Sequence, residues 1–228
     1  MTLSTLGAVV AASLATAALA MTLTALVARR LGKVSVVDIT WGLVFVAIGW
    51  VSFVVGAGSG RSLLLAALVT VWGGRLAWHI RTRALGAGED PRYDTLLADA
   101  PPGKRFGLAV RKVFVVQGLA AWFVALPLQV AAATDRPLGW IAVVGVVVWL
   151  VGVAFEGVGD AAAWWGVWLV SAEAWPGVLT VLSPVVMTYF LAFATGARLL
   201  ESQMAKRPGY PEYVERTSMF IPRPPKRS

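Results

Sequence analysis

The stretch that decides the fold runs from Leu138 to Ser171 and reads LGWIAVVGVVVWLVGVAFEGVGDAAAWWGVWLVS. It is apolar almost throughout, and its only charged residues are Glu156 and Asp160. As one helix it would be about 51 Å long at 1.5 Å per residue, far more than the roughly 30 Å of hydrocarbon in a bilayer. As two helices, the second has only about eleven apolar residues before Glu173, too few to cross the membrane. The sequence therefore predicts an abnormally short connection after Asp160.

The composition of the whole chain indicates an integral membrane protein. Of the 228 residues, 58% are hydrophobic and 14% are charged, with a mean hydropathy of +0.73, whereas soluble domains carry about 25% charged residues. Neither a linker nor a repeat divides the chain, so we expect one domain over residues 1–228. Cysteine is absent, which excludes disulfides and thiolate metal sites. The net charge of +8 lies in short loops between apolar runs, which argues against a nucleic-acid partner and for a lipid bilayer.

The apolar runs predict an all-α, polytopic bundle of six to seven membrane-spanning helices. They lack the alternation of barrel strands, and an open sheet edge cannot lie in lipid. The first run has no basic residues before it and is too long for a signal peptide, so we expect it to be retained. The predicted spans lie near Leu6–Ala28, Ile39–Ala57, Ser62–Ile80, Leu108–Ala133, Leu138–Phe155, Ala161–Ser171 and Val178–Ala197.

Basic residues are concentrated in alternate loops. Only Arg61 and Arg136 follow the second and fourth predicted spans. The positive-inside rule therefore predicts that the N-terminus is outside and that the first loop, the third loop and the C-terminus are cytoplasmic. The basic residues of these three regions include Arg29, Arg30, Lys33, Arg81, Arg83, Arg92, Lys104, Arg105, Lys206 and Arg207.

Several segments resemble one family of membrane proteins. The tail RPGYPEYVERTSMFIPRPPK, from Arg207 to Lys226, is similar to the C-terminal signature of bacterial relatives of steroid 5α-reductases (3-oxo-5-alpha-steroid 4-dehydrogenases). That family is in turn related to isoprenylcysteine carboxyl methyltransferases. The other matching segments are VDITWG at 37–42, WGGRLAWHIRTRALGAGEDPRY at 72–93, FEGVGD at 155–160, WWGVWL at 164–169 and LSPVVMTYFL at 182–191.

The chain departs from this family after Asp160. In the family, the segment resembling FEGVGD continues into a polar cytoplasmic stretch with an Arg-His-Pro-Asn-Tyr-like motif, which precedes the Trp-Trp-Gly helix. Here Gly159-Asp160 leads directly into Ala161, and the only histidine of the chain is His79. Both the family comparison and the span lengths therefore predict that an internal segment has been lost at Asp160–Ala161.

The resemblance implies an enzyme of the bacterial inner membrane. Such a protein would pass hydride from NADPH, bound on the cytoplasmic side, to an activated C=C bond of a lipid-like or steroid-like substrate. Because the missing segment would form part of the cofactor site, we expect weak or absent NADPH binding in this chain. Two alternatives remain open: a non-catalytic membrane protein derived from the family, and a methyltransferase-like membrane enzyme.

Asp38 and Trp41 are the candidate catalytic residues, at the cytoplasmic start of the second span. Reduction of an activated C=C bond requires a proton donor beside the hydride acceptor, and Asp38 could be such an acid. The alternative is that Asp38 caps the helix, since Asp readily accepts hydrogen bonds from free N–H groups there.

Arg75, His79 and Arg83 recur at intervals of four residues and would form one polar stripe at the end of the third span. Arg75 lies deepest in the apolar run. It could pair with Asp38 or Glu156, or its guanidinium could bind a phosphate or carbonyl group. A lone histidine does not make a metal site, so we predict none.

The remaining candidates come from the resemblance, which places them around the cofactor. The glycines of Gly86–Tyr93 do not form a dinucleotide-binding fingerprint and no strand precedes them, so a Rossmann domain is excluded. Glu156 and Asp160 would lie on one helix face if that helix were continuous. Together with Arg75 and Arg83, the predicted cofactor-binding residues are Glu89, Asp90, Arg92, Tyr93, Glu156, Asp160, Arg198 and Tyr213.

Overall fold

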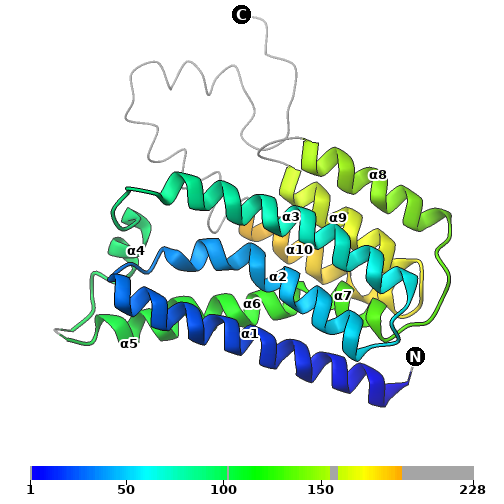
Figure 1. The fold of residues 1–228 in the computed structure, drawn as a ribbon, viewed down its shortest axis with the longest axis horizontal. Helices are drawn as coiled ribbons and strands as arrows, with labels where there is room; N and C mark the ends of the chain where they lie inside the picture. Colours follow the sequence, from blue (N-terminus) through cyan, green and yellow to red (C-terminus); the bar gives the residue numbers. More distant parts are fainter. Residues whose placement is uncertain (1, 102, 155–158, 192–228) are drawn as a thin grey trace, which may run out of the picture.

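The computed structural model describes residues 2–101, 103–154 and 159–191, which form a bundle of helices (Figure 1). No β-strand occurs in these residues. The elements are α1 (Leu3–Leu31), α2 (Val36–Val55), α3 (Gly60–Ala84), α4 (Pro91–Leu96), α5 (Arg105–Ala109), the π-helix η1 (Val110–Val115), α6 (Val116–Val124), α7 (Leu126–Ala132), α8 (Trp140–Ala154), α9 (Gly159–Ala172), the 3-10 helix η2 (Gly177–Val181) and α10 (Leu182–Tyr189).

Four helical segments of the described residues are long and apolar enough to cross a membrane. They are α1, α2, α3 and the continuous run from α5 through η1 to α6, Arg105–Val124. Two shorter apolar segments are Trp140–Ala154 and Gly177–Tyr189. The prediction of an all-α, polytopic membrane bundle is therefore confirmed.

The fourth predicted span, Leu108–Ala133, is not one helix. It is interrupted at Ala125, where ψ is 2°, and Pro127 stands at the start of α7. Proline cannot donate the backbone hydrogen bond that would continue the preceding helix. The backbone N–H of Ala57 donates to the carbonyl of Ala132 at 2.8 Å, so α7 closes over the α2–α3 turn.

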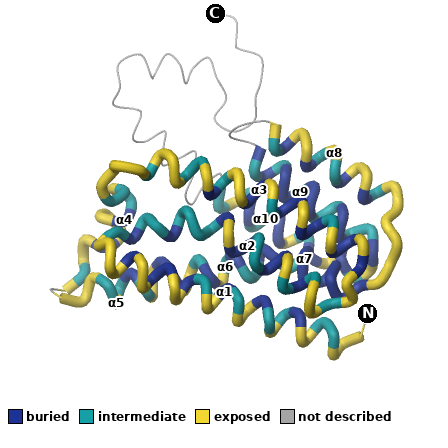
Figure 2. Tube along the Cα trace, viewed as in Figure 1, coloured by how far each residue is buried: buried dark blue, intermediate teal, exposed yellow. Residues whose placement is uncertain are grey.

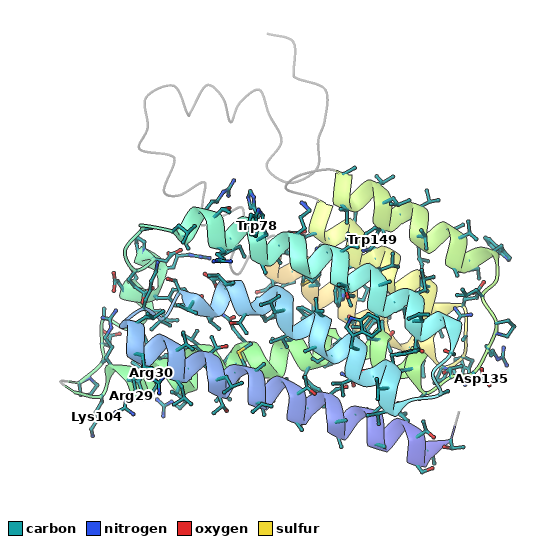
Figure 3. All side chains as sticks on the ribbon, in the orientation of Figure 1. Arg29, Arg30, Trp78, Lys104, Asp135 and Trp149 are labelled. Atoms are coloured by element: carbon teal, nitrogen blue, oxygen red, sulfur yellow. The ribbon has the colours of Figure 1, made fainter. Side chains whose placement is uncertain are left out.

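The basic residues of the first and third loops lie at one end of the bundle. Arg29, Arg30 and Lys104 project from this end, and Asp135 lies at the other (Figure 3). Arg29 and Arg30 occupy the last turn of α1, where cations interact favourably with the helix dipole. We therefore assign the basic end to the cytoplasm and the opposite, outer end to the other side of the membrane.

Glycines allow neighbouring helices to approach closely, as is common in membrane bundles. A Cβ atom on Gly42 of α2 would lie 2.5 Å from the carbonyl oxygen of Gly73 in α3. In the second close pair, Gly145 of α8 faces Gly166 of α9, and Gly152 of α8 faces Ala163. This register is antiparallel, so α8 and α9 form a hairpin. The alternative of one long helix through Leu138–Ser171 is wrong.

The two described helices of the α8–α9 hairpin are shorter than the hydrocarbon core of a bilayer. With 15 and 14 residues, α8 and α9 are about 22 and 21 Å long, short of the roughly 30 Å hydrocarbon core. The Trp72 indole N–H donates to the Asp160 carboxylate at 2.8 Å, and Trp72 is midway along α3. Within the described residues, α9 is therefore too short to cross, as the sequence predicts, and α8 is short as well.

At the outer end, a buried arginine holds the open ends of the hairpin to α3. The side chain of Arg61 is 1% exposed, and its guanidinium donates to the Glu173 carboxylate at 2.9 Å and to the Pro137 carbonyl at 2.7 Å. A further bond reaches the carbonyl of Val170. Glu173 in turn accepts the backbone N–H of Gly139 at 2.8 Å, just before α8. In the sequence Arg61 is a single cation between two apolar runs, but in the structure it joins both outer ends of the hairpin to α3.

Replacing Arg61 with Met tests this clamp. The substitution keeps the volume but leaves the Val170 and Pro137 carbonyls and the Glu173 carboxylate without their cation. We expect the free energy of unfolding to fall by about 2–3 kcal/mol, less than for a fully buried ion pair because Glu173 has some access to solvent. The measurement is an SDS titration of purified protein. Arg136→Met, an exposed cation at the same end, is the control, and an equal loss in both variants would contradict the clamp.

Candidate functional site

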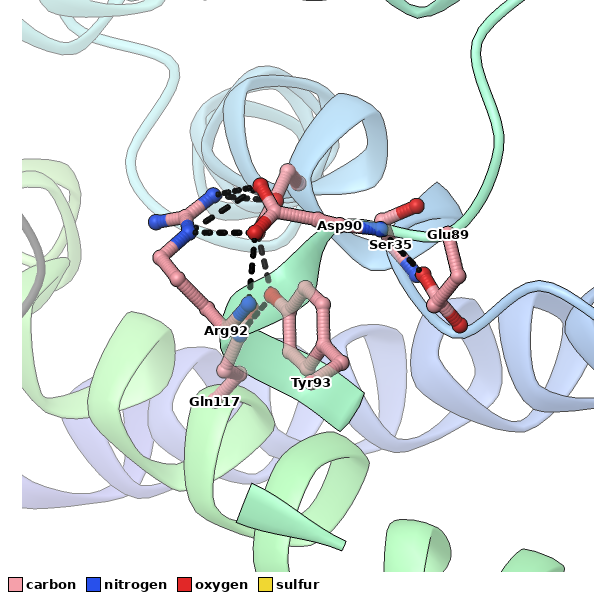
Figure 4. A network of polar contacts seen from close by, with 7 residues as sticks. Ser35, Glu89, Asp90, Arg92, Tyr93 and Gln117 are labelled. Atoms are coloured by element: carbon pink, nitrogen blue, oxygen red, sulfur yellow. Dashed lines mark hydrogen bonds and ion pairs between the residues drawn. The ribbon is translucent and has the colours of Figure 1, made fainter. Parts of the chain in front are cut away.

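A network of polar side chains lies at the cytoplasmic end of the bundle (Figure 4). Its members come from the α1–α2 loop, the first turn of α2, the loop before α4, α4 itself and α6. The network is formed by Ser35, Asp38, Glu89, Asp90, Arg92, Tyr93 and Gln117, together with the backbone N–H of Val34. These segments meet because α3 runs antiparallel to α2 and ends at the cytoplasmic end, where α2 begins.

Glu89 ties the loop before α4 to the α1–α2 loop. Its carboxylate accepts the backbone N–H groups of Val34 and Ser35, the latter at 2.9 Å, and that of Asp90 at 3.0 Å. Burial alone would raise the pKa of Glu89, but these hydrogen bonds together outweigh it and lower the pKa. The carboxylate is therefore a fixed anion that shapes the loop.

Asp90 begins α4 and orients Arg92. Its side chain accepts the Arg92 backbone N–H at 2.9 Å as the N-cap, with Pro91 in the first helical position. The Arg92 guanidinium donates to the same carboxylate at 2.8 Å. Burial opposes ionisation of Asp90, but the bonds from Arg92 lower its pKa below the ordinary value. The pKa of Arg92 is raised by the same pair, so both groups stay charged.

Asp38 joins α2 to α4 through two hydrogen bonds. It accepts the Tyr93 hydroxyl at 2.5 Å and the Arg92 guanidinium at 3.1 Å. The N-cap of α2 is Ser35, and Asp38 lies within the first turn. The alternative that Asp38 caps the helix is therefore wrong. So is its proposed pairing with Arg75, because the arginine that contacts Asp38 is Arg92.

Tyr93 is the buried hydrogen-bond donor of the network. The residue is 6% exposed, and its hydroxyl also accepts a bond from the Gln117 amide at 3.3 Å. Burial, and then the negative charge of Asp38, raise the pKa of Tyr93, so the phenol stays protonated. Arg92 and Tyr93 thus direct two donors at the Asp38 carboxylate. A carbonyl oxygen or an anion could accept from the same two donors only in place of that carboxylate.

Trp41 belongs to an aromatic cluster rather than to the polar network. Its ring meets the edge of Phe45 at a centroid distance of 5.3 Å, and Phe45 contacts both Trp72 and Trp164. Because Trp41 is three residues after Asp38 on α2, it stands one turn deeper in the membrane on the same side of the helix. The cluster connects the network to the Trp72–Asp160 bond.

The other predicted cofactor residues are not brought into the network. Asp160 lies in the first turn of α9 against Trp72. Arg75 and Arg83 are exposed on α3 and make no hydrogen bond or ion pair with another described residue. Glu156, Arg198 and Tyr213 lie outside the described residues.

Gln117 and the two backbone donors of the α1–α2 loop were not predicted from the sequence. Gln117 is a polar residue inside the apolar run of the fourth span, a signal that commonly marks a partner within a bundle. The N–H groups of Val34 and Ser35 carry no such signal, because backbone donors are common to all residues except proline.

This fold and site define a polytopic α-helical membrane protein with a polar network facing the cytoplasm. A family model described as protein of unknown function (DUF1295) matches residues 24–162 and 158–217. The chain therefore belongs to this family, which is associated with steroid 5-alpha-reductase-like proteins. The two matched segments meet at residues 158–162, where the sequence predicts a junction. No curated protein and no solved structure matches the chain.

The lowered pKa of Glu89 predicts a dependence of stability on pH. Its ordinary value is 4.5, so the stabilisation is fully present above about pH 5 and is lost as the pH falls towards the folded-state pKa. We expect Glu89→Gln to lower the free energy of unfolding at pH 7 by about 0.5–1 kcal/mol, after allowance for solvent screening. The measurement is thermal unfolding of both proteins between pH 3 and pH 7. The difference should shrink below about pH 4, and Asp99→Asn, an exposed acid of the following loop, should behave as the parent protein.

A double-mutant cycle tests the contact between Asp38 and Tyr93. Tyr93→Phe removes the hydroxyl and Asp38→Asn removes the charge that accepts it. We expect a coupling energy of about 1–2 kcal/mol because the two groups share a short, partly buried bond. The readout is again the free energy of unfolding. Asp94 pairs with Arg105 and not with Tyr93, so the effects of Tyr93→Phe and Asp94→Asn on the free energy of unfolding should be additive. Additive effects of Tyr93→Phe and Asp38→Asn would mean that the contact between Tyr93 and Asp38 is absent.

Proposed function

We propose that this protein is a membrane reductase of the bacterial inner membrane, with its reaction site at the cytoplasmic network. Its reaction would be the NADPH-dependent reduction of an activated C=C bond in a lipid-like or steroid-like substrate. The observation that carries the proposal is the meeting of Asp38, Arg92 and Tyr93 at one point. These residues come from segments that resemble the reductases, and Asp38 lies 54 residues before Arg92.

The network supplies the groups that such a reduction needs. When bound, NADPH would supply a hydride for the β-carbon of an enone and leave as NADP⁺. The Arg92 guanidinium would donate to the carbonyl oxygen as negative charge develops on it. The Tyr93 hydroxyl would release its bond to Asp38, give its one proton to the α-carbon and regain a proton from water.

The described residues fit the cofactor only in part. Arg75 and Arg83 are exposed guanidinium groups on the cytoplasmic half of α3 and suit the phosphates of a dinucleotide. Glu89 and Asp90 are already engaged by backbone N–H groups and by Arg92, so they have little capacity left for a ribose. We therefore expect weak binding of NADPH, with Arg75 and Arg83 as its main contacts.

A second candidate is a non-catalytic membrane protein derived from the reductases. It is favoured by the short α8–α9 hairpin, whose Asp160 stops at the level of Trp72, and by the family match that restarts at residue 158. Both observations support the loss of a connector that would have reached the cytoplasmic surface. In this reading the network only holds the helices together.

Consumption of NADPH in lipid nanodiscs separates the two candidates. The protein is supplied with a lipid-soluble enone, and the absorbance of NADPH is followed up to millimolar concentration. For a reductase we expect enone-dependent oxidation without saturation in the micromolar range. Tyr93→Phe should slow it by about 100-fold because the general acid is removed. Asp99→Asn should leave the rate unchanged.

Each other result counts against part of the proposal. A rate of NADPH oxidation that the enone does not change, at any NADPH concentration, would favour the non-catalytic protein. Saturation at micromolar NADPH would show that the cofactor site is complete and that the expected weak affinity is wrong. Transfer of a methyl group from S-adenosylmethionine in the same nanodiscs would support the methyltransferase-like alternative.

A further inference from the structure

An apolar groove runs along the outside of the bundle between α1 and the α5–η1–α6 segment. Its volume is about 360 Å³. On α1 it extends from Leu14 to Leu26, and on the facing segment it reaches Phe106 at its cytoplasmic end. Twelve residues of helix correspond to about 18 Å. The groove therefore matches the roughly 15 Å of hydrocarbon in one leaflet, and its position is in the cytoplasmic leaflet.

Small residues line the groove, and no polar side chain in its lining lacks a hydrogen-bond partner. Ala17, Ala18 and Ala25 of α1 line the groove together with Gly118 of α6, where a Cβ atom would meet Met21 at 3.0 Å. The hydroxyl of Thr22, which also lines the groove, already donates to the carbonyl of Ala18 at 2.7 Å. A hydrocarbon chain is the ligand that such a surface accepts.

The facing wall is not a regular α-helix. Val110, Phe114 and Val115 line the groove, and all three belong to the π-helical segment η1. Short π-helical segments within α-helices occur mostly at functional sites. Here η1 lies within the continuous helical run Arg105–Val124.

The cytoplasmic mouth of the groove is cationic. Arg29 follows Leu26 by one turn of α1, and its guanidinium lies over the Phe106 ring at 5.3 Å from the centroid. Lys104 precedes Phe106 by two residues, is exposed, and lies at the same end of the bundle as Arg29 (Figure 3). Among the described residues, the ion pairs involve neither Arg29 nor Lys104. Two cations without a carboxylate partner thus stand where a lipid headgroup would lie.

We propose that this groove binds an anionic phospholipid of the cytoplasmic leaflet. One acyl chain would lie between Leu14 and Phe106, and the phosphate would contact Arg29 and Lys104. The charge of the mouth favours an anionic over a zwitterionic headgroup, since each basic side chain near such a surface adds attraction. This site is separate from the polar network and does not depend on the proposed reductase activity.

Native mass spectrometry with matched lipids tests the proposal. Purified protein is titrated with phosphatidylglycerol and with phosphatidylcholine that carries the same acyl chains. We expect one phosphatidylglycerol per chain, bound about tenfold more tightly than phosphatidylcholine. Arg29→Gln combined with Lys104→Gln should abolish this preference. Arg136→Gln, at the outer end, should retain it.

A second pair of variants tests the acyl-chain site without altering charge. Ala18→Trp fills the groove from an exposed position, whereas Ala15→Trp adds the same side chain to an exposed position of α1 outside the groove. We expect Ala18→Trp to lose the bound lipid and Ala15→Trp to keep it. Equal lipid binding by the two variants, or equal affinity for the two lipids, would overturn the proposal. The proposal would also be overturned if the parent protein were a dimer without bound lipid and only Ala18→Trp dissociated that dimer. The groove would then bind a second copy of the chain.

Discussion

The depth at which α9 begins sets how much of α3 the α8–α9 hairpin covers. A carboxylate cannot face hydrocarbon at mid-membrane without a partner. The Trp72 indole supplies that partner for Asp160. Because the hairpin stops there, it covers only the outer half of α3. The cytoplasmic half carries exposed Arg75 and Trp78, and the outer half of the bundle is the more deeply buried (Figure 2).

The polar network does not rely on the hairpin. Asp38, Tyr93 and Gln117 are held by α2, α4 and the fourth span, and their hydrogen bonds are made among themselves. Two described links join these helices to the hairpin: the aromatic cluster from Trp41 through Phe45 to Trp72 and Trp164, and the bond from the Trp164 indole N–H to the Val124 carbonyl of α6. A change in the connector after Asp160 could therefore remove cofactor contacts while leaving the donors of the network in place. This separation is the physical basis for weighing a weakened reductase against a non-catalytic relative.

Patterns that depend on the bilayer could be predicted from the sequence, and those that depend on side-chain pairing could not. Hydropathy predicts the spans because every backbone group in lipid must be bonded within its own helix. The importance of Asp38, Arg92 and Tyr93 came from a resemblance, and their mutual bonds required coordinates because their segments are distant in the chain. Arg61 illustrates the limit most clearly. In the sequence it resembles any loop cation, yet it is 1% exposed because three acceptors from two other segments converge on it.

The geometry also explains how a connector could shorten without disturbing the remaining helices. A hairpin that enters from the outer side and returns to it adds no net crossing, so η2 and α10 begin on the same side as they would after two full spans. Its open ends are fixed at the outer end by Arg61 and Glu173, which bonds to the residues that begin α8. At the other end of α9, Asp160 accepts the Trp72 indole N–H. A loss of length between α8 and α9 therefore leaves the anchors at the outer end in place, and the orientation of the basic, cytoplasmic end is kept.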